Sequence, residues 1–294
     1  MKRTRIAGLI DVIKLDSLSD IREMTQNPDI DRRFDIFGPI GNGVLIRHLV
    51  GILSLRSQRF PTMRAKDSPG RAAEQDRLWT SLNERAGLLR DGPVELEGLA
   101  RWMKGGGRTQ ELGMLVQQAV GRQFDGAYTA TDETWAAALT LEAALREKNP
   151  IKTLAWGLTG KVRRAKTLLA SKVGGDPAAV HGTGVALHNI VGALERMRYL
   201  YVNIGLRSSL SAEEVIQRCL FAPASVVRQA TNAGTLGGCP FAKGTLFLVA
   251  LGEAQKVPGA EELVFMEKTW SRCPAEQWVP ALLTGVWKRA TLPS

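Results

Sequence analysis

The chain has 294 residues, of which 44% are hydrophobic and 23% are charged. These proportions exclude a largely disordered chain, and the length allows one large domain or two small ones. A formal net charge of +10 favours anionic partners, but no helix-turn-helix, zinc-finger or RNP pattern appears, so nucleic acid is not an expected partner.

The cysteines and the N-terminus predict the compartment. Cys219, Cys239 and Cys273 form no C-x-x-C pair, so neither a disulfide framework nor a zinc site is expected. No signal-peptide pattern follows the basic N-terminus, and no window approaches the roughly 18 uninterrupted apolar residues of a spanning helix. We therefore expect a cytoplasmic protein without a transmembrane segment, although peripheral contact with a membrane surface stays open.

Helical patterns dominate the first half of the chain. After a short extended segment at 12–15, Ser17 opens a helix that ends before Asn27-Pro28. Glycine and proline at 38–43 predict a loop. Apolar periodicity then predicts helices over 44–55, 71–89, 96–103 and 112–124.

Capping signals mark the helices of the second half. Thr131 is a suitable N-cap, Asp176 is an N-cap with Pro177 at the first helical position, and Ser211 with Glu214 forms a capping box. The predicted helices occupy 132–148, 161–172, 177–199 and 211–221.

Strand character appears only beyond residue 223. Three short segments separated by glycine turns, Val226–Ala230, Gly237–Phe241 and Thr245–Leu251, predict a small sheet. The expected fold class is therefore mainly α, as a single domain over 1–294 with a small β element at about 226–251.

Two histidines lie on the helix that Asp176 opens. His181 and His188 are seven residues apart, so they share a face but are separated by about 10.5 Å of rise and cannot both bind one metal ion. Each could be an axial haem ligand, a proton shuttle or a hydrogen-bonded core residue. Between them, Gly182-Thr183-Gly184 weakens the helix, which suits a flat ligand close to the backbone or a close helix crossing.

Cys273 is the strongest candidate for a functional cysteine. It follows Arg272 and precedes Pro274 and an apolar segment, which places it at a predicted junction between a loop and a helix. Amides at a helix start and a neighbouring arginine stabilise a thiolate, and a thiolate suits haem iron. The alternative is an inert cysteine packed beside a tryptophan-rich helix.

Four motifs follow one another in the C-terminal third: Arg228-Gln229-Ala230, Gly237-Gly238, Lys243-Gly244-Thr245 and Cys273-Pro274. Their order resembles the haem-thiolate cytochromes (the cytochrome P-450 family). Segments 16–22 and 29–34 are similar to the opening of that family. The family's Glu-x-x-Arg is absent, and 267–270 reads Glu-Lys-Thr-Trp where the family has Phe-Gly-x-Gly.

The resemblance implies a fold that is cytochrome P-450-like in part and a bound haem. Cys273 would then be the iron ligand, Arg228 a partner of a haem propionate or a structural partner, and His181 and His188 further cofactor contacts. Thr183 would be the catalytic hydroxyl on the helix that resembles the family's distal helix.

Two functions follow as expectations. The first is a haem-dependent oxidoreductase, monooxygenase-like or peroxygenase-like, which acts on an apolar small molecule and could use a redox partner. The second is a non-catalytic basic helical protein that binds an acidic protein or a membrane surface.

Overall fold

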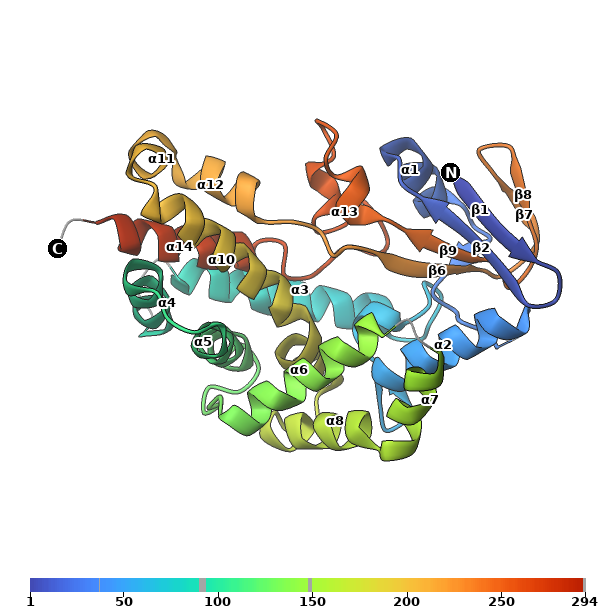
Figure 1. Ribbon diagram of the computed structural model, residues 1–294, viewed down its shortest axis with the longest axis horizontal. Coiled ribbons are helices and arrows are strands. Elements are labelled where there is room, and N and C mark those ends of the chain that lie inside the picture. The colour runs from blue at the N-terminus through green and yellow to red at the C-terminus, as the bar shows by residue number, and fades with distance from the viewer. Residues whose placement is uncertain (37, 90–93, 148–149, 293–294) are drawn as a thin grey trace. The chain divides into compact units, whose positions relative to one another are not determined.

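Residues 1–36, 38–89, 94–147 and 150–292 are described in the computed structural model of the chain (Figure 1). Contacts divide the chain into two units. Unit 1 comprises Met1–Gln75 and Ala222–Cys273, and unit 2 comprises Asp76–Phe221 and Pro274–Ser294. The predicted class, mainly α with a small sheet, is confirmed, whereas the single domain over 1–294 stays a prediction.

Unit 1 contains a five-stranded sheet in the order β1-β2-β9-β6-β3 (Figure 1). Its strands are β1 (Lys2–Ile6), β2 (Ile10–Leu15), β3 (Ile30–Asp31), β6 (Val226–Ala230) and β9 (Leu246–Val249). β2 runs parallel to β9, and the other neighbouring pairs are antiparallel.

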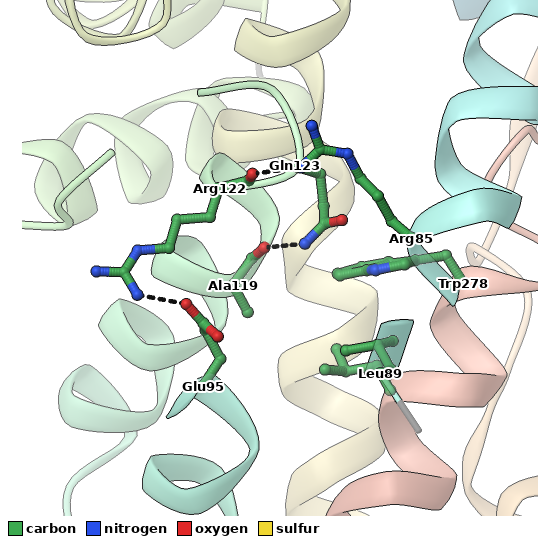
Figure 2. A pocket seen from close by; sticks show the side chains of 8 residues that line it. Arg85, Leu89, Glu95, Ala119, Arg122, Gln123 and Trp278 are labelled. Carbon is green, nitrogen blue, oxygen red and sulfur yellow. Dashed lines mark hydrogen bonds and ion pairs between the residues drawn. The ribbon is translucent and has the colours of Figure 1, made fainter. Parts of the chain in front are cut away.

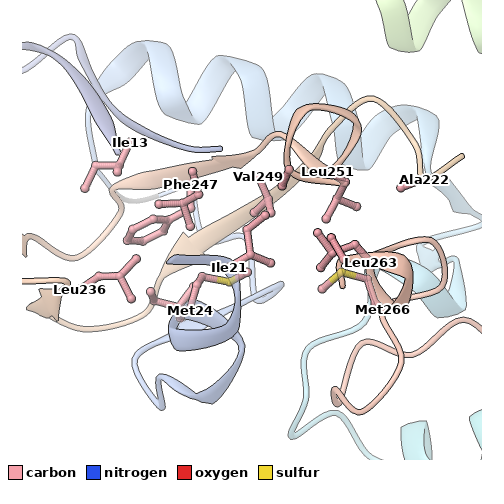
Figure 3. Packing of buried hydrophobic residues seen from close by; sticks show 14 of the residues in the cluster. Ile13, Ile21, Met24, Ala222, Leu236, Phe247, Val249, Leu251, Leu263 and Met266 are labelled. Atoms are coloured by element: carbon pink, nitrogen blue, oxygen red, sulfur yellow. The ribbon is translucent and has the colours of Figure 1, made fainter. Parts of the chain in front are cut away.

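Alternation of side chains along the strands gives this sheet two buried faces. On one face, Ile13 and Phe247 pack with Ile21 and Met24 of α1 (Leu18–Gln26) (Figure 3). On the other face, Leu246 and the partly buried Val12 pack with Ile46 of α2 (Ile40–Ile52) and with neighbouring apolar residues. The sheet of unit 1 is therefore covered by a helix on each face.

The prediction that strands lie mainly between 226 and 251 is wrong, because β1, β2 and β3 precede them. β1 reads Lys-Arg-Thr-Arg-Ile and is largely exposed at the edge of the sheet, so it lacks the apolar alternation of a strand. A two-stranded hairpin, β4 (Ser54–Leu55) and β5 (Gln58–Arg59), also replaces the expected end of the second helix.

The expected C-terminal strands are present; the first has the predicted bounds, Val226–Ala230, and the other two are shorter than predicted. β6 and β9 lie within the sheet, while β7 (Gly234–Leu236) and β8 (Cys239–Phe241) form a hairpin. Gly237 and Gly238 make the turn of that hairpin, with φ of 53° and 75°, a region that glycine enters without steric cost. The short helix α13 (Leu251–Ala254) follows β9.

Unit 2 is helical, and the predicted caps are confirmed. Thr131 and Ser211 form capping boxes, and the Asp176 side chain accepts from the Ala178 amide at 2.7 Å. α3 begins in unit 1. The helix predicted over 132–148 was expected to end at Lys148, which lies outside the described residues. Two further helices, α7 and α11, were not predicted. The helices are α3 (Arg71–Leu88), α4 (Val94–Gly105), α5 (Thr109–Gly121), α6 (Asp132–Arg146), α7 (Pro150–Thr159), α8 (Lys161–Lys172), α9 (Pro177–His181), α10 (Leu187–Val202), α11 (Ile204–Ser209), α12 (Ala212–Cys219) and α14 (Trp278–Thr291).

A π-helical turn, Gly182–Ala186, separates α9 from α10. A Cβ on Gly182 would lie 3.1 Å from Phe124, and one on Gly184 would lie 2.8 Å from both Leu141 and Leu169. The two glycines therefore permit close packing between helices, which was one of the two explanations for them. No helix in the described part of the chain has the length and apolarity to cross a membrane.

Candidate functional site

Four cationic side chains of unit 1 surround the indole ring of Trp270. The guanidinium carbons of Arg32, Arg71 and Arg228 lie 4.6, 5.2 and 5.7 Å from the ring centroid, and Lys66 Nζ lies 5.8 Å from it. We call these five residues the Trp270 cluster. Arg32, Arg71 and Arg228 are buried, with exposed fractions of 4%, 9% and 5%.

Several elements of unit 1 bring the cluster together. Arg32 directly follows β3, Arg71 is the first residue of α3, and Arg228 is the central residue of β6. Alternation along β6 sends Gln229 to the opposite side, where its amide exchanges hydrogen bonds of 2.7 and 2.8 Å with the Asp35 backbone. Trp270 lies in the loop between Leu263 and α14.

The acid nearest the cluster, Asp31, is already engaged by backbone amides. Its carboxylate accepts from the Arg32 amide at 2.6 Å and from the Lys66 amide at 3.0 Å. A single carboxylate, held in this way, does not balance three guanidinium groups and an ammonium group.

The guanidinium groups donate to neutral acceptors. Arg32 donates to the Thr62 carbonyl, Arg71 to the Trp270 carbonyl, and Arg228 to the Val227 carbonyl and to Ser271 Oγ, both at 2.7 Å. The buried Nε atoms of Arg32 and Arg71 have no hydrogen-bond partner among the described residues. The cluster therefore contains charged donors that lack an anionic acceptor.

The electrostatic environment of the cluster is unfavourable for its cations. Burial, with the neighbouring Arg228 and Arg71, holds the pKa of Arg32 well below its usual value, and burial lowers the pKa of Arg228 to about 10. Desolvation costs several kcal/mol for each buried ion, whereas a desolvated cation–π contact returns about 2 kcal/mol. Because arginine stays protonated at neutral pH, an anion would relieve this imbalance.

The Trp270 loop leads directly to Cys273 and is tied to the start of α3. Gln75 Nε2 donates to the Arg272 carbonyl at 2.9 Å, and the Cys273 amide donates to the Phe265 carbonyl at 2.8 Å. Met266 and Lys268 have φ of 53° and 58°, values that favour glycine. The half-buried Cys273 thus follows Trp270 by three residues in a constrained loop.

The predicted helix start at Pro274 is wrong, because α14 begins at Trp278 with Gln277 as its N-cap. Residues 274–277 form turns instead. Cys273 therefore lies five residues before the first helical residue and does not adjoin the free amides of a helix start.

Thr183 lies in unit 2 and is fully buried in the π-helical turn. Its hydroxyl donates to the Ala179 carbonyl at 2.7 Å, and its carbonyl accepts from Gln117 Nε2 at 2.9 Å. The catalytic role of Thr183 stays a prediction, and it requires the hydroxyl to leave the Ala179 carbonyl.

His188 packs against α6 in unit 2. Its Nε2 lies 3.3 Å from the Ala138 carbonyl and its Nδ1 lies 3.3 Å from Glu142, while its ring contacts Trp135 at 5.5 Å between centroids. Burial lowers the pKa of His188, although Glu142 opposes the change. These contacts are those of a hydrogen-bonded core residue, and cofactor contact by His188 stays a prediction.

The π-helical turn also changes the relation between the two histidines. His181 ends α9, whereas His188 lies in the first turn of α10. A π turn accommodates an additional residue, so it rotates α10 relative to α9 and the seven-residue spacing no longer gives a shared face. Cofactor contact by His181 likewise stays a prediction.

Of the Trp270 cluster, only Arg228 was predicted from the sequence as a site residue. Arg32 lies in the 29–34 segment noted for its resemblance, and Lys66 and Arg71 lie in an arginine-rich polar stretch. Trp270 was noticed only as a departure from the Phe-Gly-x-Gly pattern. No local pattern identifies the cluster, because its members come from 32, 66–71, 228 and 270.

Similarity to known proteins is found in the fold. The structure of Mycobacterium smegmatis CYP164A2 with econazole bound has 16% sequence identity to this chain. The match covers 98% of this chain and 86% of that chain, with a TM-score of 0.58. Retinoic acid-bound cyanobacterial CYP120A1 has 14% sequence identity. The match covers 98% of this chain and 83% of that chain, with a TM-score of 0.63. A single-residue variant of cytochrome P450 OleT in complex with arachidonic acid has 10% sequence identity. The match covers 97% of this chain and 82% of that chain, with a TM-score of 0.63.

Neither a protein-family model nor a curated protein matches the sequence. The structural similarity extends over nearly the whole chain, and it shows that the chain has a cytochrome P450-like fold.

Proposed function

We propose that the protein binds haem, with Cys273 as the thiolate ligand of the iron and the arginines of the Trp270 cluster as partners of the haem carboxylates. The observation that carries the proposal is the group of buried guanidinium donors around Trp270, which lack an anionic acceptor among the described residues, while a half-buried thiol follows Trp270 by three residues. Within a cytochrome P450-like fold, this combination matches the two kinds of contact that a haem requires.

The chain contains hydrogen-bond donors for the haem carboxylates and a thiol that could bind the haem iron. Arginine donates to carboxylates in a planar, often bidentate arrangement, and the unpartnered Nε atoms of Arg32 and Arg71 would gain acceptors. Positive charge near a cysteine favours its thiolate, which is the form that binds iron. Haem would supply the redox chemistry, in the oxidation of an apolar small molecule.

The proposed substrate is an apolar small molecule. Two of the similar structures hold long apolar acids, arachidonic acid and retinoic acid. In this chain, the Thr183 hydroxyl is engaged by the Ala179 carbonyl, so we do not assign it the delivery of protons.

Haem reconstitution of the purified protein tests the ligand. We expect a Soret band and, after reduction with carbon monoxide, a thiolate-type band that Cys273→Ser abolishes. Cys219→Ser is the matched control, because Cys219 is the buried last residue of α12, and it should leave the band unchanged. No Soret band in the reconstituted parent protein, or an unchanged thiolate-type band in Cys273→Ser, would contradict the proposal.

Haem dimethyl ester tests the carboxylate partners. The ester lacks both carboxylates, so the parent protein should bind it at least about tenfold more weakly than haem. Arg32→Met and Arg228→Met should weaken haem binding while they leave ester binding nearly unchanged. Equal losses for both ligands would mean that the arginines act only on the fold.

A specific surface favours a second candidate function, binding to an anionic membrane surface. Ile40 of α2 is 72% exposed, and Leu9, at the turn between β1 and β2, is 46% exposed. The Ile40 amide donates to the Gly8 carbonyl at 3.1 Å and the Gly41 amide to the Leu9 carbonyl at 2.7 Å, which places the exposed residues side by side. Ile6, Ile36 and Val44 are also more than half exposed.

Arg5 of β1 and Arg47 of α2 are also exposed. Because this region of the protein is both basic and apolar, it is complementary to an anionic lipid surface. Sedimentation with phosphatidylserine vesicles tests the candidate, with phosphatidylcholine vesicles as the comparison. Ile40→Asp should abolish the binding and Leu158→Asp, at an 80% exposed position of α7, should not. Equal binding by both variants would exclude this surface.

A further inference from the structure

Unit 2 contains an open groove of about 330 Å³ between α6 and α8, two helices that pack against each other (Figure 1). Ala136 and Ala137 of α6 and Ala165 of α8 line it with small side chains, and Leu168 adds apolar surface. No member of the Trp270 cluster contributes to this groove. Its middle is therefore low and apolar.

The helix on one side of the groove belongs to a strongly basic segment of the chain. Residues 148–175 contain seven lysines and arginines and neither aspartate nor glutamate, in a chain with a formal net charge of +10. In α8, Lys161, Arg163 and Arg164 are exposed, and none of the three has a carboxylate partner among the described residues. The surface of α8 therefore presents positive charge that the protein itself does not balance.

These cations gather at the start of α8. A Cβ on Gly160, the N-cap residue, would lie 3.8 Å from Arg164 Nη1 and 3.9 Å from Arg163 Nη2, so both guanidinium groups turn back toward the first residue of the helix. Lys161 Nζ lies 5.9 Å from the centroid of the Trp156 ring in α7. The positive end of the α8 macrodipole lies at the same place.

The groove is polar along its length as well as basic. Lys161 and Arg164 line it from α8, and Glu133 lines it from the first turn of α6. Because α6 and α8 run in opposite directions (Figure 1), Glu133 lies at the end of the groove away from the start of α8. One end is thus positive and the other negative, with apolar side chains between them.

A second hollow of unit 2 differs from the groove in its charges. This cavity of about 200 Å³ is lined by residues that include Arg85 and Arg122. Arg122 is paired with Glu95, and Arg85 donates to the Arg122 carbonyl at 2.8 Å (Figure 2). Since these cations have partners within the protein, the groove is the better match for an anionic partner.

We propose that the groove between α6 and α8 docks an acidic amphipathic helix of a protein partner. Carboxylates of that helix would pair with Lys161 and Arg164, and its apolar face would lie over the alanines and Leu168. An apolar centre with a charged rim is the usual composition of a protein interface. A nucleic acid backbone would bring phosphates against Glu133, and a flat lipid surface would leave the groove unfilled.

Fluorescence anisotropy of a labelled peptide with the haem-free protein tests the proposal. The probe has about 15 residues, a length that can form a helix alone, with leucines on one face and glutamates beside that face. It should bind at least about tenfold more tightly than a peptide with glutamine in place of glutamate, and than a scrambled peptide whose leucines do not share a face. Equal binding of the scrambled peptide would overturn the proposal, and so would tighter binding of polyuridylate or binding to phosphatidylserine vesicles that Arg164→Glu abolishes.

Two charge reversals on α8 assign the binding to the groove. Arg164→Glu should weaken probe binding at least about fivefold, because it replaces a partner of the carboxylates by a like charge. Lys172→Glu is the matched control, since Lys172 is exposed on the same helix but does not line the groove, and it should change the affinity less than about twofold. Equal losses in the two variants would mean diffuse attraction by the whole helix and would overturn the proposal.

A substitution that fills the groove tests its apolar part. Ala136 is exposed and lines the groove, so Ala136→Gln adds bulk without charge and should weaken probe binding at least about fivefold. Ala73→Gln, at an exposed position of α3 outside the groove, should leave the affinity unchanged. Parental affinity in Ala136→Gln would contradict docking in the groove. The result is independent of haem binding, which the Soret band reports.

Discussion

Asp11 in β2 is a buried acid whose partners come from three segments of unit 1. Arg3 donates to both of its oxygens at 2.8 Å, Thr245 Oγ1 donates to it at 2.6 Å, and Asn42 bonds to its backbone. Burial opposes ionisation, but the hydrogen bonds from Arg3 and Thr245 outweigh it and hold the pKa of Asp11 below its usual value.

Asp11→Asn should therefore lower the free energy of unfolding at pH 7 by about 2 kcal/mol. Because the folded pKa is lowered, the stabilisation by Asp11 is present above its unfolded pKa of about 3.9 and is lost as the pH falls through the folded value. Urea unfolding between pH 2 and 7 should show the two proteins converging at the acid end. Asp67→Asn, at a side chain that is 66% exposed, should change little at any pH.

Cys219 should be the least reactive of the three cysteines. It is 1% exposed, and burial raises its pKa to about 11, although Arg196 and Arg218 oppose the change. At pH 8 the folded protein should react with a thiol reagent at Cys219 at least about 100-fold more slowly than an unperturbed thiol does. Variants that each retain one cysteine allow the measurement. A rate for Cys219 that equals the rate for the half-buried Cys239 would contradict the packing around α12.

Gly184 and Gly157 are helical glycines in different surroundings, one closely packed and one open. Gly184 faces Leu141 and Leu169, both fully buried, whereas a Cβ on Gly157 of α7 would have no atom within 4 Å. Overpacking costs about 1 to 3 kcal/mol, and alanine returns up to about 1 kcal/mol of helix propensity. Thermal unfolding should show Gly184→Ala destabilised and Gly157→Ala unchanged or stabilised. If Gly184→Ala is the more stable protein, the π-helical turn does not pack as described.

At the level of elements, local signals determined what the sequence could predict. Thr131, Asp176 and Ser211 cap helices because a side-chain oxygen satisfies amides within three residues, which is readable from adjacent positions. The start of α2 at Ile40 was missed because its first amides bond to the Gly8 and Leu9 carbonyls. β1 was missed because pairing with β2, and not its own composition, makes it a strand.

The candidate site was less predictable than the fold for the same reason. Arg228 was identified through its resemblance to a known motif, and Cys273 through its sequence neighbours as well as such a resemblance. Arg32, Lys66 and Arg71, in contrast, could be recognised only from their distances to Trp270. The expected helix start at Pro274 also failed. A proline suits the first turn of a helix, but the turns at 274–277 precede α14 here.

At the scale of the whole molecule, neither unit is continuous in the sequence. Unit 1 resumes at Ala222 after the long insertion of unit 2, and unit 2 resumes at Pro274 to add α14. A fragment that ends at Phe221 therefore lacks β6 and β9 of the sheet as well as α14. We expect this fragment to lose cooperative thermal unfolding, measured by circular dichroism, and a cooperative transition in the fragment would contradict the division into units.

The contact between Asp11 and Thr245 spans 234 residues, and it has a consequence for synthesis on the ribosome. At about 5 to 20 residues per second, β2 would wait roughly 12 to 47 s before β9 leaves the exit tunnel. During that interval one edge of the β1–β2 hairpin has no neighbour, and unpaired strand edges favour association with other chains. Expression at a lower temperature, or with a holdase chaperone, should therefore increase the soluble yield more than substitutions at the surface do.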